Sequence, residues 1–486
     1  MNTFIHVEKL RLKFPKEEAL LFKDLDVSIQ KGEKVLLLGP SGCGKSTLLQ
    51  VLAGIIPHSI EVPMKAETLS IPDSSGYVFQ DPDSQFCMPY ADEEIAFVLE
   101  NLQVPREQMK EMIVRFLEKV GLKLPDLHTN IQTLSGGQKQ RLAIASILAL
   151  EPEVLFLDEP TAMLDPEGTK EVWDTIKQLE ADKTLIIVEH KIEHVIDIVD
   201  RILVFNDNGE IIADGAKNEI LQTHLPLFRK HGIWYPGVWE EYMSERFITR
   251  EEEKDRTPII TLKDFNVYRK KSPVTSVKEA MVYPGEWIVV MGENGAGKST
   301  LLQGLMQLLK TTGYYELLEK PVNKKTEMFS KLAYVFQNPE FQFVTNSVYD
   351  EMAHSMRLEK EEESVITEKV NVMLKRYSLE AHQHKHPYQL SIGQKRRLSV
   401  ASSIMQKQPI LLLDEPTFGQ DSKNTFALLE YLEQERKKGT AIVMVTHDNN
   451  IAEHYATRKW TVSSGKLIDE CPIHPSESTL LMRVEG

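Results

Sequence analysis

Runs of consecutive apolar residues, each followed by a glycine or a polar residue, recur along the chain. Residues 35–38, 154–157 and 185–188 contain only apolar side chains. A short, uninterrupted apolar run between turn residues predicts a strand that is buried on both faces. Residues 5–14 instead alternate between apolar and polar side chains, which predicts a strand with one polar face.

The same series of runs returns in the second half of the chain, at residues 288–291, 410–413 and 441–445. Repetition over half the length of the chain predicts two homologous domains, each long enough to bury its own core. We place the first domain at residues 1–235 and the second at 259–486, with an acidic linker at 236–258.

Composition narrows the class of protein. The chain has 486 residues, three cysteines and a formal net charge of −15. Such a charge repels nucleic acid and anionic lipid headgroups, and three scattered cysteines exclude a cysteine-ligated zinc framework. No apolar run approaches the roughly 20 residues that span a bilayer, and residues 1–9 lack a signal-peptide core. We expect a cytoplasmic protein that binds no nucleic acid and reaches a membrane only through protein partners.

A glycine-rich loop follows the first apolar run of each half. Both loops fit G-x-x-x-x-G-K-[ST], in which backbone N–H groups surround a phosphate chain. Lys45 and Lys298 place a positive charge near the β and γ phosphates, and the hydroxyls of Ser46 and Ser299 are placed to ligate Mg²⁺. The predicted phosphate-binding residues are Gly39, Pro40, Ser41, Gly42, Cys43, Gly44, Lys45, Ser46 and Thr47, and Gly292, Glu293, Asn294, Gly295, Ala296, Gly297, Lys298, Ser299 and Thr300.

Two adjacent carboxylates end a later apolar strand in each half, Asp158-Glu159 and Asp414-Glu415. Neighbouring residues of a strand point in opposite directions, so the two carboxylates can take different roles. Asp158 and Asp414 suit the binding of Mg²⁺, whereas Glu159 and Glu415 suit the orientation or deprotonation of water. Adjacent acids after an apolar strand are costly without such a purpose.

Other polar residues end strands at matching positions of the two halves. Gln80 and Gln337 can offer an amide oxygen to Mg²⁺ or to the attacking water, although each alone would be an ordinary polar residue at a strand end. His190 and His447 follow the strands after the carboxylates, and the repeat favours contact with a γ phosphate over a structural role.

Aromatic residues also recur at matching positions. Phe14 and Tyr268 precede the glycine-rich loops at similar distances, where each ring could stack on a purine or simply be a half-buried strand residue. The repeat favours stacking. The histidines His382, His384 and His386 could indicate a metal site, but they have few carboxylates nearby and we disfavour it.

A further motif opens a predicted helix. It reads Leu134-Ser135-Gly136-Gly137-Gln138 in the first half and Leu390-Ser391-Ile392-Gly393-Gln394 in the second. Small residues at a helix N-terminus leave backbone N–H groups free for an anion. We predict that phosphate is bound by Ser135, Gly136, Gly137, Gln138, Ser391, Gly393 and Gln394.

In this order, the glycine-rich loop, the Gln loop, LSGGQ, the carboxylate strand and the His strand resemble the ATP-binding cassette (ABC) family. The resemblance implies an α/β fold of two tandem P-loop NTPase domains with a RecA-like core, each with a β-subdomain and a helical subdomain that carries the signature. It implies an ATPase that uses ATP and Mg²⁺. It also implies that the two cassettes of one chain pair head to tail, with each ATP between one P-loop and the opposite signature.

The segments after the Gln loops narrow the resemblance. The ATPases of energy-coupling-factor importers are similar in two matching segments, Gln80-x-Pro82-x-x-Gln85-Phe86 with Glu93-Glu94-Ile95-Ala96-Phe97, and Gln337-x-Pro339-x-x-Gln342-Phe343 with Asp350-Glu351. Val188-Glu189-His190 and Phe418-Gly419-Gln420-Asp421 also look like that group. A fused pair of this kind resembles the hydroxymethylpyrimidine/thiamine import ATP-binding proteins. This resemblance implies import of a vitamin-type molecule or a metal ion. It also implies peripheral binding at the cytoplasmic side of the cell membrane, to a transmembrane coupling component and a substrate-binding component.

Phe86 and Phe343 follow the Gln loops within largely polar stretches. Exposed aromatics in such a setting indicate partner contact, so we predict that residues 82–97 and 339–352 dock membrane subunits. The rival class is the soluble twin-cassette ATPases that act on ribosomes. Those carry a long basic linker, whereas the segment between these domains is short and acidic.

The two signature sequences differ at one position, where Gly136 is matched by Ile392. A β-branched residue resists φ > 0 and crowds a phosphate. In the crossed arrangement Ile392 would face the ATP held by Lys45 and Glu159. We therefore predict faster hydrolysis at the site of Glu415.

Overall fold

The computed structural model describes residues 3–15, 19–162, 164–179, 183–244 and 257–472. The chain divides into two compact units, Met1–Val238 with Asp421–Lys423, and Trp239–Gln420 with Asn424–Gly486. Each unit is described by itself. Most of the predicted acidic linker lies outside the described residues, so the domain limits stay a prediction.

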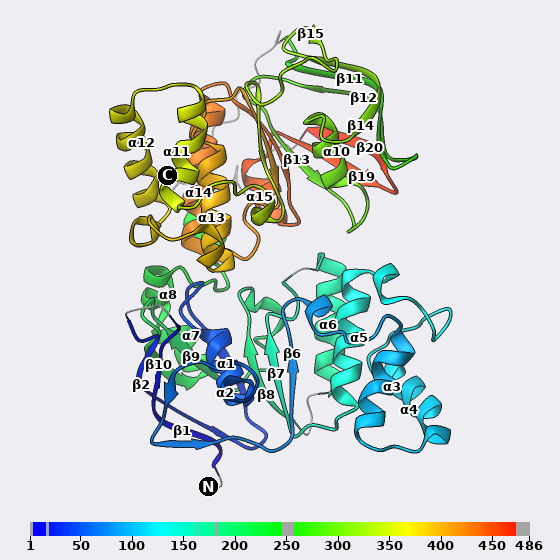
Figure 1. Ribbon diagram of the computed structural model, residues 1–486, viewed down its shortest axis with the longest axis vertical. Helices are drawn as coiled ribbons and strands as arrows, with labels where there is room; N and C mark the ends of the chain where they lie inside the picture. Colours follow the sequence, from blue (N-terminus) through cyan, green and yellow to red (C-terminus); the bar gives the residue numbers. More distant parts are fainter. Residues whose placement is uncertain (1–2, 16–18, 163, 180–182, 245–256, 473–486) are drawn as a thin grey trace, which may run out of the picture. The chain divides into compact units, whose positions relative to one another are not determined.

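A six-stranded sheet forms the centre of the first unit, in the order β10-β9-β3-β8-β7-β6 (Figure 1). Its strands are β3 (Lys34–Leu38), β6 (Ser75–Val78), β7 (Val154–Asp158), β8 (Thr184–Val188), β9 (Arg201–Phe205) and β10 (Ile211–Ala216). All neighbouring strands are parallel except β9 and β10. Every residue of β7 and β8 is buried. The carboxyl ends of β3, β7 and β8 therefore meet at one edge, where ligand sites of such sheets form.

A smaller antiparallel sheet completes the strands of this unit. It consists of β1 (Thr3–Leu12), β2 (Phe22–Gln30), β4 (Met64–Lys65) and β5 (Thr68–Ser70). The helices are α1 (Lys45–Leu52), α2 (Ile55–His58), α3 (Ala91–Asn101), α4 (Arg106–Lys119), α5 (Gly136–Leu148), α6 (Pro166–Leu179), α7 (Lys217–Thr223) and α8 (Leu225–His231). Helix α5, which begins with the signature glycines, lies beside α3 and α4 (Figure 1).

In the second unit the antiparallel strands and the parallel core strands belong to one ten-stranded sheet. Its order is β15-β14-β11-β12-β20-β19-β13-β18-β17-β16. The strands are β11 (Ile260–Arg269), β12 (Ser272–Val282), β13 (Trp287–Met291), β14 (Lys310–Leu317), β15 (Lys320–Pro321), β16 (Leu332–Val335), β17 (Ile410–Asp414), β18 (Ala441–Val445), β19 (Arg458–Ser463) and β20 (Lys466–Pro472). One residue pair, Ser276 of β12 with Lys466 of β20, connects strands β11, β12, β14 and β15 to the other six strands.

The helices of the second unit begin with α9 (Val238–Ser244), which overlaps the division between the units. They continue with α10 (Lys298–Leu305), α11 (Val348–Leu358), α12 (Glu363–Arg376), α13 (Ile392–Ser403), α14 (Ser422–Lys437) and α15 (Asn449–Tyr455). In both units a parallel α/β core carries antiparallel strands and a group of helices, as the sequence predicted. Among the described residues, no helix is both long and apolar enough to cross a membrane.

Candidate functional site

The glycine-rich loops lie between the first core strand and the first core helix of each unit. Gly44 and Gly297 stand immediately before α1 and α10 with φ of 104° and 103°, a region that favours glycine. The buried ammonium of Lys45 donates to the carbonyls of Gly39 (2.8 Å) and Pro40 (2.9 Å). Lys298 donates to the matching carbonyls of its own loop at 2.7 and 2.9 Å. The two loops thus share the same glycine conformation before the helix and the same lysine contacts.

The serine after each lysine contacts the carboxylate at the end of the neighbouring strand. The Ser46 hydroxyl donates to Asp158 Oδ1 at 2.6 Å, and the Tyr77 hydroxyl donates to Oδ2 at 2.8 Å. Burial raises the pKa of Asp158, and these two hydrogen bonds oppose the rise. Ser299 and Tyr334 make the same contacts with Asp414 at 3.0 and 3.3 Å.

A hydroxyl and a buried carboxylate side by side are a donor set that suits Mg²⁺, which prefers oxygen ligands. Burial raises the pKa of Asp158 despite its two hydrogen bonds, so a bound cation would stabilise the ionised carboxylate. The residues present therefore fit the ion, and Ser46 with Asp158, and Ser299 with Asp414, would hold it. Gln80 and Gln337, which we also predicted as ligands, stand at the end of the adjoining strand.

The second carboxylate of each pair contacts the strand-end histidine. Glu159 Oε1 lies 3.0 Å from His190 Nε2, and Glu415 Oε1 lies 3.4 Å from His447 Nε2. Glu159 also accepts a hydrogen bond of 2.8 Å from Gln80 Nε2. Both glutamates have positive φ, 47° and 51°, a strained backbone that in functional sites serves to aim a side chain.

Electrostatics in the first unit favour an ion pair between glutamate and histidine. Burial alone would raise the pKa of Glu159, but the charge and hydrogen bond of His190 outweigh it and hold the pKa below its usual range. Burial alone would lower the pKa of His190, and Glu159 reverses this effect, so the pKa is raised. Glu159 is therefore an ionised acceptor that can orient water or take a proton from it.

Several predicted site residues lie on other elements. Ser135 and Ser391 precede α5 and α13, and each forms a reciprocal capping pair with its third neighbour, Gln138 or Gln394. Phe14 is 39% exposed, and the Lys310 ammonium lies 5.7 Å from the centroid of the Tyr268 ring. The roles that we assigned to the signature and to these rings stay predictions.

Of the three histidines, His382 ends a short 3-10 helix, His384 lies in the turn that follows, and His386 caps the next 3-10 helix. His386 accepts a hydrogen bond from the backbone N–H of Tyr388, and His382 Nε2 lies 3.0 Å from Gln394 Nε2. Within the described ranges no group of three or more His, Cys, Asp or Glu side chains is arranged to hold a metal ion.

One expectation about exposed aromatics is wrong. Phe343 is only 8% exposed, because Tyr388 packs edge-on against its ring at 6.3 Å. Phe86 is partly buried. The exposed apolar side chains after the second Gln loop are Phe341 and Val344, at 75% and 69%.

Sequence reasoning missed three kinds of site residue. Tyr77 and Tyr334, which donate to the aspartates, occur in both copies of Tyr-Val-Phe-Gln, so the repeat alone could have indicated them. Glu189 is buried beside His190 and accepts from its backbone N–H (3.0 Å) and from the Thr161 hydroxyl. Burial raises the pKa of Glu189 to about 7. Its counterpart is Thr446, so no repeat pointed to it. Arg396, a buried cation on α13, is the third.

Comparison with known proteins places the chain among its relatives. Residues 22–162 and 278–418 each match the family model described as ABC transporter. The chain is 39% identical over 495 residues to the Bacillus subtilis protein named "Putative HMP/thiamine import ATP-binding protein YkoD", with 94% of this chain and 89% of the relative covered. It is 33% identical over 527 residues to a "Putative ABC transporter ATP-binding protein" of Methanosarcina acetivorans, with 96% and 86% covered.

Among solved structures, the chain is similar to an archaeal ribosome recycling factor crystallised with the ribosomal stalk protein aP1. The TM-score is 0.61 at 20% sequence identity, and the match covers 98% of this chain and 92% of the other. Identity this low shows a shared twin-cassette fold and nothing more.

Proposed function

Because the chain belongs to the ABC transporter family and is an ATPase with two cassettes, we propose that it energises the import of a small molecule. The partners would be integral-membrane subunits, a transmembrane coupling component and a substrate-binding component, as in energy-coupling-factor importers. The cargo would be of the vitamin type, with a thiamine precursor as the first candidate and a metal ion as the second. The Bacillus subtilis relative named for HMP/thiamine import supports this choice, since the resemblance covers 94% of this chain and 89% of the relative.

At each site the chain's own residues do the work of positioning that phosphoryl transfer needs. Lys45 and Lys298 hold the phosphate chain. Glu159 and Glu415 orient the attacking water and accept its proton, and the neighbouring histidine fixes the carboxylate. When bound, Mg²⁺ would supply positive charge against the phosphate oxygens. The crossed pairing of each P-loop with the opposite signature is part of this proposal.

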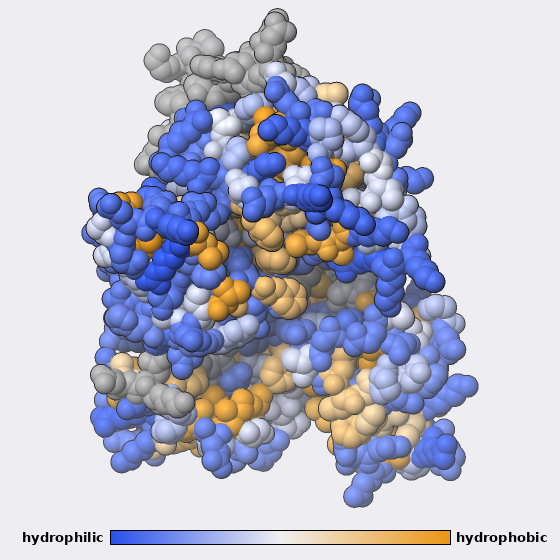
Figure 2. All heavy atoms as spheres, turned by 45° about the horizontal axis from the view of Figure 1, so that its top comes forward, coloured by the Kyte–Doolittle hydropathy of each residue, from blue (hydrophilic) through white to orange (hydrophobic). Residues whose placement is uncertain are grey.

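The main structural support for a membrane partner is an apolar surface beside the second Gln loop, which we call the Phe341 surface. It consists of Phe341, Val344 and Tyr388, which are 75%, 69% and 51% exposed. Figure 2 shows a mainly hydrophilic face on which apolar side chains gather in separate patches. Tyr388 packs against Phe343 and donates to the carbonyl of Glu340, in the same loop as Phe341 and Val344. Several exposed apolar side chains on one loop indicate an interaction site better than a single one does.

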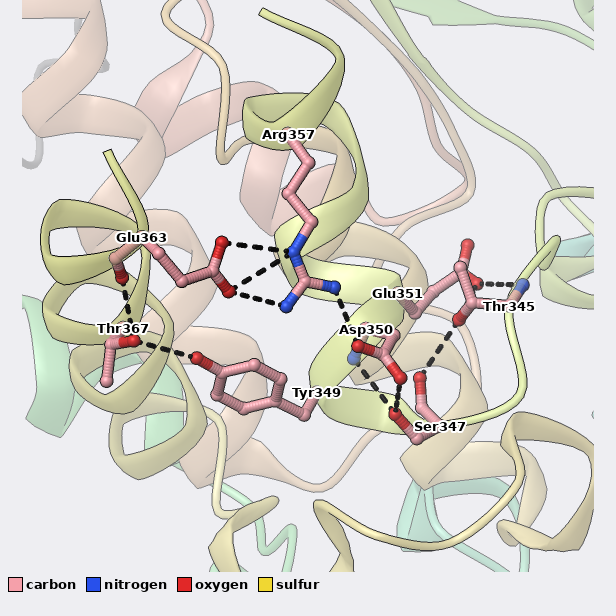
Figure 3. Close-up of polar contacts among 8 residues, drawn as sticks. All are labelled: Thr345, Ser347, Tyr349, Asp350, Glu351, Arg357, Glu363 and Thr367. Carbon is pink, nitrogen blue, oxygen red and sulfur yellow. Dashed lines mark hydrogen bonds and ion pairs between the residues drawn. The ribbon is translucent and has the colours of Figure 1, made fainter. Parts of the chain in front are cut away.

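Hydrogen bonds to a buried glutamate hold the backbone of this surface in place. Glu351 is 5% exposed, and its carboxylate accepts hydrogen bonds from the backbone N–H groups of Val344 (3.0 Å) and Thr345 (2.9 Å). Arg357 then joins Asp350 of α11 to Glu363 of α12 at 2.7 and 2.6 Å (Figure 3). A rigid loop that begins at Gln337 can transmit a partner's movement to the ATP site.

The first cassette has the same support but a different surface. The buried Glu94 accepts from the backbone N–H groups of Cys87 and Met88, each at 2.9 Å. Ser84 and Cys87 occupy the positions of Phe341 and Val344. The loop of the first cassette therefore has the same hydrogen-bonded support but a less apolar surface. We infer that the second cassette makes the larger apolar contact with a membrane subunit.

The experiment replaces Phe341 and Val344 with aspartate in the full chain and measures its share in the membrane fraction. We expect the double variant to leave the membrane, while ATP hydrolysis by the purified chain stays at the parent rate. Ser84→Asp plus Cys87→Asp is the matched control and should have the smaller effect. Full membrane association of the Phe341→Asp, Val344→Asp chain would contradict the proposal, and recovery with ribosomes would favour the rival class.

A further inference from the structure

Arg396 is a buried arginine that joins three segments of the second ATP site. It lies on α13, just after the signature, and is 4% exposed. Its Nη1 donates to the carbonyl of Phe336 at 3.2 Å, directly before Gln337. Its guanidinium carbon lies 5.8 Å from the centroid of the Phe418 ring, in the segment after Glu415.

We propose that Arg396 is a positioning residue of the second ATP site, and that its buried positive charge restrains Glu415 and Asp414 in a way that the first site lacks.

The electrostatic surroundings of Arg396 support this role. Burial lowers its pKa to about 10, and the charges of Glu415 and Asp414 oppose the fall. The guanidinium is therefore charged at neutral pH. Among the described residues no carboxylate lies within 4.0 Å of it, and its Nε is buried without a hydrogen-bond partner. A buried charge without a direct ion pair is costly, so the two site carboxylates are the charges that offset it.

The first cassette provides a natural comparison at the same position. There the repeat places Gln140, which is 1% exposed and donates from Nε2 to the carbonyl of Phe79 at 3.3 Å. Phe79 directly precedes Gln80, as Phe336 precedes Gln337. Ala162 takes the place of Phe418. A glutamine therefore keeps the hydrogen bond to the Gln-loop strand and lacks both the charge and the ring contact.

The consequence follows from where the charge lies. Glu415 and Asp414 are adjacent carboxylates and repel each other. A fixed positive charge behind them offsets this repulsion and favours one direction for Glu415, whereas Lys298 and its loop belong to another element. Loss of the charge should therefore slow hydrolysis and leave the apparent affinity for ATP nearly unchanged. A role in folding alone would lower stability without separating kcat from KM.

The test uses the purified full chain with Glu159→Gln, so that Glu415 carries the hydrolysis, and MgATP as the probe. We expect Arg396→Gln to lower kcat about tenfold, which is equivalent to about 1.4 kcal/mol in the barrier. We expect KM for ATP to change by less than about twofold, and Arg396→Lys to keep most of the rate because it keeps the charge. Gln140→Met, made in the chain with Glu415→Gln instead, is the matched control and should have the smaller effect.

Two results would overturn the proposal. One is unchanged kcat for Arg396→Gln, and the other is an equal fall for the lysine and glutamine variants. If Arg396→Gln does not fold, Arg396→Lys and Arg396→Met are compared, and the proposal requires the lysine variant to be the faster.

Discussion

The two cassettes are alike in the residues predicted to bind phosphate and Mg²⁺, and they differ in the buried side chains that adjoin those residues. Both have the glycine-rich loop, the Ser–Asp–Tyr contact and the Glu–His contact. Behind these, the first cassette buries Glu189 where the second has Thr446, and the second buries Arg396 where the first has Gln140. The first site thus has an additional buried acidic side chain, and the second has an additional buried, positively charged side chain. Two sites built from the same motifs need not share one electrostatic field or one rate.

The largest effect should come from what the cassettes share. The double change Lys45→Ala plus Lys298→Ala removes the ammonium from both loops, and we expect steady-state ATP hydrolysis to fall at least about a thousandfold, or about 4 kcal/mol in the barrier. A double variant that hydrolyses ATP near the parent rate would show that these loops do not hold the reacting phosphates.

A change at Glu189 should separate the cassettes by pH. The folded pKa of Glu189 is raised to about 7 from the usual 4.5, so between these values the folded chain binds more protons than the unfolded chain. The contribution of Glu189 to the free energy of unfolding therefore falls as pH rises through this range. Glu189→Gln removes this loss, and its stability gain over the parent should grow from near zero at pH 4.5 to about 3 kcal/mol at pH 8.

The measurement is urea denaturation of the parent and Glu189→Gln at several pH values. Thr446→Val, at the matching position of the second cassette, should show no such growth with pH. A constant difference between Glu189→Gln and the parent would mean that Glu189 does not titrate near neutrality.

The smallest effect should come from the tyrosines behind the aspartates. Tyr77→Phe and Tyr334→Phe each remove one hydrogen bond to a buried carboxylate, which is worth about 1 to 2 kcal/mol. The Tyr77 bond is the shorter, 2.8 against 3.3 Å, so we expect the larger loss of melting temperature from Tyr77→Phe. The reverse order in thermal denaturation would mean that these distances do not rank the two contacts.

The sequence predicted those parts of the site that depend on local chain geometry. Apolar runs and glycine spacing predicted the strands, the loops and the edge where Asp158 and His190 lie. It did not predict the burial of Phe343, because Tyr388, which covers it, lies far along the chain. Nothing in the sequence singled out Arg396, which follows the signature between Lys395 and Arg397. Arg396 is buried because α13 packs against β16, the strand that leads to Gln337. Local sequence patterns do not predict packing between elements so far apart in the chain.

Whether the two ATP sites are unequal is tested by comparing Glu159→Gln with Glu415→Gln in the otherwise unchanged chain. Steady-state hydrolysis of MgATP is measured for both variants at the same protein concentration. We expect the larger loss from Glu415→Gln, by about tenfold, since that site has Arg396 and, in the proposed crossed arrangement, the intact Gly136 signature. Equal losses, or a larger loss from Glu159→Gln, would contradict it.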